Sequence, residues 1–419
     1  MAKKRLIVIG GGAAGFFCAV NAAKMYVQLE VTIVEKTSKL LSKVKVSGGG
    51  RCNVTHALFD IVEMSKRYPR GQNFVKKTFH QFFTTDTIQW FEERGVRLKK
   101  EDDGRMFPVT DSSQTVIDCL MHEVNKHHVK IMMNSEVKEI RRQSDQFKVE
   151  LSGLRELVAD YVCIACGGYP KASMFQWLQQ LGHTINDPVP SLFTFNLPAH
   201  PITRLMGVSV DKAKVKIEGT KLQEEGPVLI THWGLSGPAV LRTSAWGARA
   251  LNDKNYRFTA HINWIPDYND AQLKELFQSF RSQHTSKKVI NHNFSHLPSR
   301  LWQFLLEQSG IDENIRFSDL PVKQENALIR NLVDYVGEVK GKTTFKEEFV
   351  TAGGIQLSEV DANTMMSRII PNLYFAGEIL DVDGITGGFN FQHAWTSGYI
   401  AAKSMGNIEQ GTRNNLSRP

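Results

Sequence analysis

The chain contains 419 residues, of which 42% are hydrophobic and 22% are charged. This composition is typical of a soluble globular protein with room for two domains. It excludes a collagen-like fibre, a disordered tail protein and a multi-span membrane protein. Lysine and arginine number 51 against 43 acidic residues, and the net charge of +8 favours anionic ligands without requiring a nucleic acid. Five cysteines, a small and odd number, favour reduced thiols in a cytoplasmic protein.

The apolar run 6–23 could be mistaken for a signal peptide or a membrane span, because Lys3, Lys4 and Arg5 precede it. Four glycines within six positions, from 10 to 15, interrupt that run. Glycines weaken a helix but are expected where a buried strand turns sharply into a helix. We therefore predict neither export nor membrane insertion for this segment.

The same segment has the pattern of a dinucleotide-binding fold. An apolar strand at 6–9 leads into glycines in G-x-G-x-x-G spacing, a helical stretch, and a second strand at 31–34 followed by an acid. In such a fold the first glycine permits a tight turn, the second lets a pyrophosphate approach the backbone, and the third lets helix and strand pack closely. The acid accepts hydrogen bonds from a ribose. The residues expected to hold the ADP moiety are Gly10, Gly12, Ala13, Ala14, Gly15, Glu35 and Lys36.

No second G-x-G-x-x-G occurs in the sequence. We therefore expect one dinucleotide to be held permanently. A second nucleotide would have to dock without a Rossmann domain of its own.

A second glycine-rich loop, SGGGRCN, follows at 47–53. Three successive glycines allow the backbone to approach a flat or charged ligand. The arginine offers a cation for phosphate, and the cysteine adds a polarizable thiol. A surface turn without a ligand explains the same spacing equally well. The candidate cofactor-binding residues of this loop are Ser47, Gly48, Gly49, Gly50, Arg51, Cys52 and Asn53.

Residues 72–95 are predicted to be helical, with aromatic residues at core-like spacings and a stop at Gly95. Basic residues interleave with these aromatics, a pattern that can also stack on and clamp RNA. We favour an amphipathic helix whose rings face the core, because the phenylalanine spacing fits a buried stripe. The residues of the pattern are Phe74, Phe79, Phe82, Phe83, Trp90 and Phe91, with Lys66, Arg67, Arg70, Lys76 and Lys77.

Strands at 129–133 and 158–165 are predicted to complete a parallel sheet. Cys163 and Cys166 form a C-x-x-C at the end of the second of these strands. Alternation along a strand points their side chains to opposite faces, so we predict no disulfide between them.

From about residue 191 the pattern changes to alternating strands, with apolar residues at every second position of 256–264. Amphipathic helices are predicted to follow at 270–283, 299–308 and 321–336. We predict that these elements form an inserted α+β domain that shapes a substrate pocket.

Near the C-terminus, a buried strand at 372–376 runs into Gly377 and Glu378. A glycine-rich turn and a helix at 390–402 follow. A carboxylate there can accept protons from polyol hydroxyls, while the first amides of the helix stabilise negative charge on a ring. FAD requires both interactions, because its ribityl chain and ring lie beyond its pyrophosphate. NAD requires neither.

Five motifs carry a family resemblance: the glycines at 10–15, SGGGRCNVT at 47–55, DGRMFP at 103–108, THWGLSGP at 231–238 and FAGEILDVDGITGGFNFQ at 375–392. Together they resemble the BaiN/RdsA family of NAD(P)/FAD-dependent oxidoreductases over about residues 4–404. The resemblance implies an α/β fold, a glutathione-reductase-like FAD-binding Rossmann domain with an inserted α+β domain. The expected segments are 1–190 and 350–405 for the FAD domain, 191–349 for the insertion, and 406–419 for a polar tail.

The resemblance also implies further cofactor contacts. Val137 would meet the adenine through its backbone, the turn at 166–168 would pass beside the cofactor, and Glu378 would contact the ribityl chain. The start of the last helix would present amides to the pyrimidine edge of the flavin. The residues implied are Val137, Cys166, Gly167, Gly168, Gly377, Glu378, Gly388, Asn390, Phe391 and Gln392.

Three positions depart from the family pattern. Lys45 stands in a usually apolar approach to Ser47, and Cys166 stands where threonine is common. Phe389 replaces a usual tyrosine, which removes a hydroxyl, so we assign no catalytic role to it.

Cys52 is the first candidate for proton transfer. It is a thiol expected beside the flavin, and Arg51 and helix dipoles there could lower its pKa. A packing role explains Cys52 equally well. Arg105 is a candidate for holding an anionic substrate. Ser236 lacks the G-x-S-x-G elbow and is interpreted as a turn, His232 is a pocket candidate only, and the 13 histidines show no spacing that predicts a metal site.

The preferred function is an FAD-dependent oxidoreductase, reduced by NAD(P)H, that reduces an activated C=C bond of a small unsaturated substrate. The family resemblance leaves open a ribosomal RNA uridine reductase and an oxygen-using small-amine oxidase. A flavin-holding sensor without turnover is the remaining alternative. The expected location is the cytoplasm, with no membrane association, and the sequence leaves the oligomeric state open.

Overall fold

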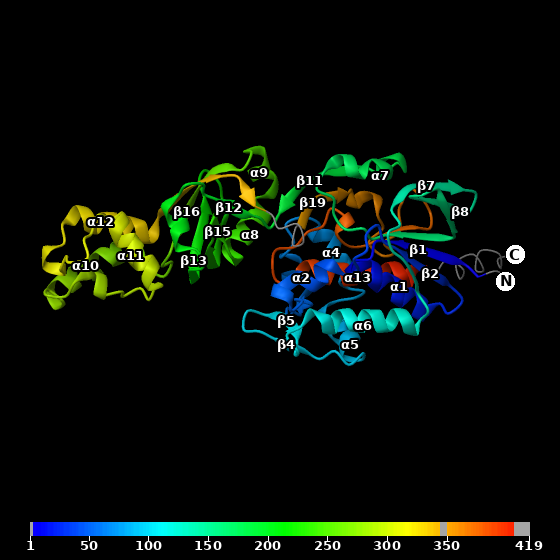
Figure 1. The fold of residues 1–419 in the computed structure, drawn as a ribbon, viewed down its shortest axis with the longest axis horizontal. Coiled ribbons are helices and arrows are strands. Elements are labelled where there is room, and N and C mark those ends of the chain that lie inside the picture. Colours follow the sequence, from blue (N-terminus) through cyan, green and yellow to red (C-terminus); the bar gives the residue numbers. More distant parts are fainter. Residues whose placement is uncertain (1–2, 344–349, 406–419) are drawn as a thin grey trace. The chain divides into compact units, whose positions relative to one another are not determined.

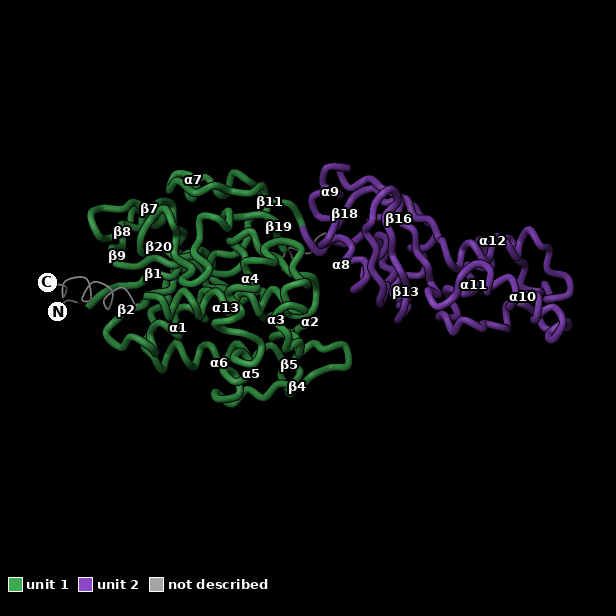
Figure 2. Tube along the Cα trace, turned by 180° about the vertical axis from the view of Figure 1, so that it is seen from behind, with its two compact units in different colours: residues 1–190, 345–419 green, residues 191–344 purple. Residues whose placement is uncertain are grey.

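The computed structural model describes residues 3–343 and 350–405. The chain divides into two compact units, residues 1–190 with 345–419, and residues 191–344 (Figure 2). The first unit therefore combines both ends of the chain, and the second is inserted between them. The predicted tail at 406–419 and the predicted domain boundary at 349 lie outside the described residues.

A five-stranded parallel sheet forms the centre of the first unit, in the order β20-β10-β1-β2-β6. Its strands are β1 (Arg5–Ile9), β2 (Glu30–Val34), β6 (Lys130–Met132), β10 (Tyr161–Ile164) and β20 (Leu373–Phe375). All four residues of β10 and all three of β20 are buried, as expected for parallel strands covered on both faces. The last strand in sequence thus lies at one edge of a sheet begun by the first.

Helices α1 (Ala13–Met25) and α13 (Phe389–Ser404) pack side by side against this sheet (Figure 1). Gly398 permits their close approach, because a Cβ atom there would lie 2.7 Å from the carbonyl oxygen of Ala14. Both helices are buried over most of their length, which agrees with their apolar sequences. The contact brings the two ends of the chain together at the predicted nucleotide site.

Shorter elements surround the central sheet. The helices are α2 (Ser42–Gly50), α3 (Ile61–Ser65), α4 (Gln72–Thr78), α5 (Thr84–Glu92), α6 (Ser113–Lys126) and α7 (Gln176–Gln180). The small sheets are β3 (Thr55–His56), β4 (Leu98–Lys100) and β5 (Arg105–Pro108); β7 (Val137–Gln143), β8 (Gln146–Leu151) and β9 (Arg155–Ala159); and β11 (Ile185–Ser191) with β19 (Val350–Ile355).

Two predicted elements of this unit are wrong in their extent. The single helix predicted at 72–95 is two helices, α4 and α5. The chain turns between them where the Asp86 carboxylate accepts a hydrogen bond from the Phe83 amide. The strand predicted at 158–165 is also two elements, because β9 belongs to an antiparallel sheet and β10 to the parallel one. In both segments the apolar residues continue across the break. The hydrophobic pattern therefore does not reveal that the chain changes direction there.

The burial of the aromatic pattern follows the interpretation that we favoured. Its rings are 0–8% exposed, while Lys66, Arg67, Lys76 and Lys77 are exposed to solvent. The rings therefore belong to the core of the unit, and only the cations remain available to an anionic partner.

The second unit is built on a seven-stranded antiparallel sheet, in the order β17-β16-β13-β14-β15-β12-β18. Gly341 alone separates β17 from β18, so the strand at one edge continues into the strand at the other. The strands are β12 (Thr194–Asn196), β13 (Ser209–Ile217), β14 (Gln223–Ile230), β15 (Gly234–Ser236), β16 (Arg257–Asn263), β17 (Tyr335–Lys340) and β18 (Lys342–Thr343). Phe258, Ala260 and Ile262 are buried on one face of β16, following the predicted alternation.

The helices of this unit are α8 (Pro238–Trp246), α9 (Ala248–Asp253), α10 (Asp270–Gln283), α11 (Ser299–Gln308) and α12 (Val322–Val333). The helix predicted at 321–336 is too long by three residues, because Tyr335 already begins β17 with alternate residues buried. The side chains of α10, α11 and α12 join those of the sheet in one apolar core.

Candidate active site

The three glycines of the G-x-G-x-x-G motif differ in their surroundings. A Cβ atom would lie 2.4 Å from the Ala165 carbonyl oxygen at Gly10, and 2.0 Å from the Gly10 carbonyl oxygen at Gly15. A Cβ atom at Gly12 would meet nothing within 4 Å. Gly10 and Gly15 are therefore required by the protein itself, whereas the space beside Gly12 is open at the start of α1. Helix α1 has no acidic residue in its first turn, so its amide groups suit an anion such as a pyrophosphate.

Glu35 lies at the end of β2 and closes the glycine loop. Its Oε2 accepts a hydrogen bond of 2.8 Å from the Gly11 amide, and its Oε1 accepts two of 2.9 Å from Thr37. The Ser135 amide donates to the Glu35 carbonyl oxygen at 2.9 Å, which brings the start of β7 and Val137 to the same end of the sheet. The structure thus gathers the residues predicted at the adenosine end. Lys36 is exposed there, with its Nζ 5.5 Å from the Tyr169 ring centroid.

The second glycine loop has an unusual backbone. Gly48, Gly49 and Gly50 adopt φ of +58°, +69° and +84°, values that favour glycine. A Cβ atom at Gly48 would lie 2.7 Å from the Phe107 ring, whereas Gly49 and Gly50 border open space. The backbone at Gly49 and Gly50 is therefore accessible to a flat or charged ligand, as the sequence predicts.

The predicted lowering of the Cys52 pKa is wrong. Cys52 is 0% exposed, and burial raises the pKa of its thiol to about 12 despite a hydrogen bond from Ser47 that acts in the opposite direction. The side chain of Arg51 points instead to carboxylates outside the core. A thiol in this setting is neutral at physiological pH and packs against the loop.

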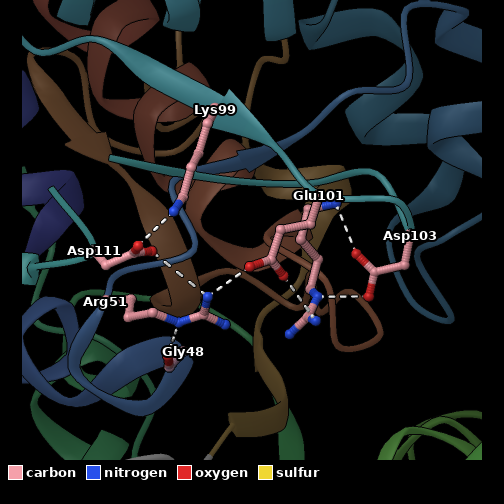
Figure 3. Close-up of polar contacts among 7 residues, drawn as sticks. Gly48, Arg51, Lys99, Glu101, Asp103 and Asp111 are labelled. Carbon is pink, nitrogen blue, oxygen red and sulfur yellow. Dashed lines mark hydrogen bonds and ion pairs between the residues drawn. The ribbon is translucent and has the colours of Figure 1, made fainter. Parts of the chain in front are cut away.

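Figure 3 shows that Arg51 and the neighbouring DGR turn belong to one charged network. Arg51 donates to Glu101 at 2.5 Å and to the Gly48 carbonyl oxygen at 3.3 Å, with its guanidinium 4.0 Å from the Phe107 ring centroid. Arg105 contacts the other oxygen of Glu101 at 3.0 Å and Asp103 at 2.6 Å. An anionic substrate or phosphate would therefore compete with carboxylates of the chain for either guanidinium.

Strand β3 and Asn53 before it connect the second glycine loop to the start of α13. With its amide oriented so that the oxygen faces Gly388, the Asn53 side chain accepts from the Gly388 amide at 2.9 Å and donates to the Thr55 carbonyl oxygen at 2.9 Å. His56 Nδ1 contacts the Gly387 carbonyl oxygen at 3.0 Å, and its ring stacks on Phe389 with centroids 4.7 Å apart. A Cβ atom at Gly388 would lie 2.6 Å from the Thr55 carbonyl oxygen. The two motifs, about 330 residues apart in the chain, thus form one structure.

A second segment, the strap at 67–71, holds the same turn from another direction. The Tyr68 hydroxyl donates to the Phe389 carbonyl oxygen at 2.6 Å, and the Ile385 amide donates to the Arg67 carbonyl oxygen at 2.9 Å. Arg70 forms a two-point ion pair with Asp383, whose side chain is fully buried. The turn between β20 and α13 is therefore fixed by both β3 and the strap.

The predicted role of the last helix needs one correction. The Gln392 amide already donates to the Gly388 carbonyl oxygen, and its side chain is engaged with Thr55, Thr87 and Thr396 inside the core. Gln392 therefore has no amide to offer a flavin. The first-turn amides belong to Phe389, Asn390 and Phe391. The Asn390 side chain closes the turn by two bonds to Gly384.

Polar atoms converge around the turn at Gly377 and Glu378. The Glu378 carboxylate accepts from the Thr351 amide at 2.9 Å and pairs with Lys43 at 2.5 Å. His393 Nε2 donates to the Gly377 carbonyl oxygen at 3.3 Å. Within the described residues, Thr351 Oγ1 and His393 Nδ1 are buried without a hydrogen-bond partner. Buried polar atoms of this kind are expected to have partners, so they agree with a polar ligand at this turn.

The two cysteines of the C-x-x-C pair have different partners. All five cysteines, each within the described part of the chain, are free thiols. Cys163 contacts Cys18, whereas Cys166 accepts from the Tyr169 hydroxyl at 3.2 Å. Burial raises the pKa of Cys166 to about 11. At Gly167 a Cβ atom would meet nothing within 4 Å, so this turn also borders open space.

The GLSGP motif lies in the second unit. Ser236 ends β15, where the sequence predicts a turn, and His232 is exposed with its ring 4.0 Å from that of Trp233.

Sequence reasoning missed several residues of the site. His56, Tyr68, Asp383, Thr351 and His393 act through contacts between distant segments, which no local spacing reports. One signal was present: His56 directly follows the SGGGRCNVT motif and lies on the strand that the motif begins.

One protein family and two relatives of known activity match nearly the whole chain. The family described as HI0933-like protein Rossmann domain matches residues 4–404. A 3-dehydro-bile acid delta(4,6)-reductase of Clostridium scindens is 29% identical over 411 residues, covering 96% of this chain and 98% of that protein. A ribosomal RNA dihydrouridine synthase of Escherichia coli is 30% identical over 408 residues, covering 95% and 97%.

Among solved structures, a 3-ketosteroid-delta4-(5alpha)-dehydrogenase of Rhodococcus jostii has a similar fold. Its TM-score is 0.50 at 12% identity, covering 96% of this chain and 98% of that one. In the described part of the chain, no helix combines the length and the apolar sequence needed to span a bilayer.

Proposed function

Because the chain belongs to the HI0933-like Rossmann family, as its resemblance to the BaiN/RdsA family predicts, we propose that it reduces a C=C bond conjugated to a carbonyl group. The predicted enzyme class, an FAD-dependent oxidoreductase, is confirmed by the family match and by the reductive activities in the names of both relatives.

The residues of the site fit FAD. The open space at Gly12 and the amides of α1 suit the pyrophosphate, and Glu35 suits the adenine ribose. Glu378, with the unpartnered hydroxyl of Thr351 beside it, suits a polyol chain. The amides at the start of α13 suit the electron-rich edge of a ring. When bound, FAD supplies hydride chemistry, and the chain supplies its orientation and electrostatics.

The two relatives support C=C reduction because the reactions that their names describe share one chemical change. A delta(4,6)-reductase saturates double bonds of a steroid-like acid, and a dihydrouridine synthase adds two hydrogens across the double bond of a uracil ring. In a 3-dehydro steroid and in uracil alike, a neighbouring carbonyl activates the bond. A conjugated C=C bond is therefore the chemistry that both share, and a small unsaturated molecule is our preferred substrate.

We propose NAD(P)H as the electron donor. The sequence contains a single G-x-G-x-x-G motif, and this motif forms the turn between β1 and α1. NAD(P)H would therefore have to dock transiently, without a Rossmann domain of its own. A cytoplasmic location is part of this proposal, since all five thiols are free.

Uridine in ribosomal RNA is the second candidate substrate. It is favoured by the 30% identity to the Escherichia coli dihydrouridine synthase, which extends over nearly all of both chains. The exposed cations Lys66, Arg67, Lys76 and Lys77 could contact phosphates, although the buried rings between them cannot stack on bases. This substrate requires an exposed or flipped base and an affinity that falls steeply with salt.

FAD binding is supported by the contrast between the filled spaces at Gly10 and Gly15 and the open space at Gly12, within a chain of this family. Reduction of a C=C bond is supported by the reactions that the names of the two relatives describe. The test starts from purified protein whose flavin content is measured by absorbance. It is then reduced anaerobically with NADH or NADPH, and an unsaturated ketone, a uridine-containing RNA or oxygen is added while flavin absorbance is followed.

Rapid reoxidation by the unsaturated ketone, and not by its saturated analogue, is the expected result. Reoxidation by RNA alone would transfer the proposal to the second candidate. Reoxidation by oxygen alone, or a protein that binds no flavin, would contradict C=C reduction by this chain.

A further inference from the structure

His56 lies where three segments meet beside the start of α13. It belongs to β3, its ring stacks on Phe389, and its Nδ1 contacts the Gly387 carbonyl oxygen at 3.0 Å. A carbonyl oxygen only accepts, so Nδ1 carries the proton in this contact. The second nitrogen, Nε2, has no hydrogen-bond partner among the described residues, which leaves it free to take up a proton.

The charged groups that face His56 come from three segments. Asp103 from the turn between β4 and β5 raises its pKa, while Arg67 from the strap and Arg105 from β5 lower it. Burial is the largest effect, and the net result is a pKa below the ordinary value of 6.5. Without a further anion, protonated His56 is therefore disfavoured by its surroundings.

The start of α13 next to His56 carries a partial positive charge from the free backbone amides of its first turn. The amides of Phe389, Asn390 and Phe391 are the first three of α13, and Asn53 and Tyr68 hold this turn in place. An anion at a helix start is stabilised by the free amides, and a cation close to it adds to that stabilisation. A protonated His56 would therefore add to the helix start in stabilising an anion placed there.

We propose that His56 is a positioning residue that brings a titratable positive charge to the start of α13 and thereby favours the reduced, anionic form of bound FAD. The inference rests on the proposed function, since it requires the flavin ring to lie at this helix start. By linkage, protonated His56 favours the reduced ring, and the reduced ring favours protonated His56 by the same factor.

Other titratable groups near the turn do not explain such an effect. Cys52 and Tyr68 are buried with raised pKa values, so both stay neutral in the physiological range. His393 is fully buried, and its pKa is lowered to about 4. His56 is therefore the group in this cluster whose charge changes closest to neutral pH.

The test measures the midpoint reduction potential of bound flavin against pH, from about 5.5 to about 8.5, by equilibration with a reference dye under argon. The proteins are wild type, His56→Asn, which keeps an N–H donor without the charge, and His56→Phe, which keeps the ring stack. His80→Asn is the matched control, because His80 is exposed on another segment. At low pH we expect the ratio of reduced to oxidised flavin to be about two- to fivefold higher in wild type than in His56→Asn.

The difference should disappear at high pH, where His56 is neutral in the wild type. Both His56 variants should behave alike, and His80→Asn should follow wild type. A wild-type curve without a bend in the histidine range would overturn the proposal even if neither variant folds. So would a His56→Phe curve that follows wild type. A protein that binds no flavin would instead contradict the proposed function and leave no potential to measure.

Discussion

The two glycine-rich turns of the site are held in place by different means. In the turn between β1 and α1, backbone atoms approach so closely that Gly15 has room for no side chain, with the Gly10 carbonyl oxygen 2.0 Å from its Cβ position. The turn before α13 is held by the side chains of Asn53, His56 and Tyr68, which come from other segments. The first turn is thus fixed by local sterics, whereas the second depends on side chains from distant segments, and one of these, His56, can titrate.

The largest expected effect concerns the second turn. Arg70→Met should lower the free energy of unfolding by about 3–5 kcal/mol, because it leaves the carboxylate of Asp383 buried without its guanidinium. The control is Lys66→Met, which breaks the exposed pair of Lys66 with Glu63 and should cost less than about 1 kcal/mol. Urea unfolding followed by circular dichroism measures both. Equal losses would show that the strap does not hold the turn.

A pH dependence of similar size is expected from His393, which lies on α13 and contacts the Gly377 carbonyl oxygen. Burial lowers its pKa to about 4, so between that value and 6.5 the unfolded chain binds a proton that the folded protein does not. Stability conferred by neutral His393 is therefore present above pH 6.5 and is lost as the pH falls towards 4. Its full contribution is about 3 kcal/mol. Unfolding experiments across this range should show a smaller slope for His393→Gln than for wild type, and an unchanged slope would contradict the assignment.

The first turn is tested by a pair of substitutions that add the same methyl group. Gly15→Ala should destabilise the protein by about 1–3 kcal/mol or more, since the backbone must move to admit a Cβ atom. Gly12→Ala should leave the stability of the flavin-free protein within about 0.5 kcal/mol, because its Cβ atom would meet nothing. It should nevertheless weaken FAD binding. Thermal unfolding of the flavin-free protein, combined with FAD titration, separates the two. Normal FAD affinity in Gly12→Ala would refute the predicted path of the pyrophosphate.

The smallest effect is expected from Tyr68→Phe. The change keeps the ring and removes the hydroxyl that donates to the Phe389 carbonyl oxygen at 2.6 Å, at a cost of about 1 kcal/mol. Tyr256→Phe is a matched control in the second unit, where the hydroxyl donates to Asn252 on a partly buried surface. Denaturant midpoints of the two variants compare them. A larger loss for the control would argue against a special role of Tyr68.

The same contrast explains what the sequence predicts and what it does not. The strand, glycines, helix and acid of the first turn are adjacent in the chain, so the identities of Gly10, Gly12 and Gly15 suffice to assign their environments. The matches of β16, α10 and α11 to their predicted segments have the same origin, because periodic burial within one element is a local property.

The second turn could not be predicted in this way. His56 and Gly387 are 331 residues apart, and the contact arises only when β3 and α13 are placed in one unit. The reactivity expected of Cys52 failed for the same reason: its identity and neighbours suggest an activated thiol, but its full burial decides its pKa. The break between α4 and α5 was missed because Phe82 and Phe83 stay buried as the chain changes direction.

We propose that this chain holds one FAD and uses it to reduce a conjugated C=C bond. This activity is tested most directly by an anaerobic single turnover, in which the flavin-containing protein is reduced photochemically and mixed with an α,β-unsaturated ketone. We expect the flavin absorbance to return, and mass spectrometry to find one product molecule, two hydrogens heavier than the substrate, for each flavin oxidised. A flavin that stays reduced in the presence of both the ketone and a uridine-containing RNA would contradict it.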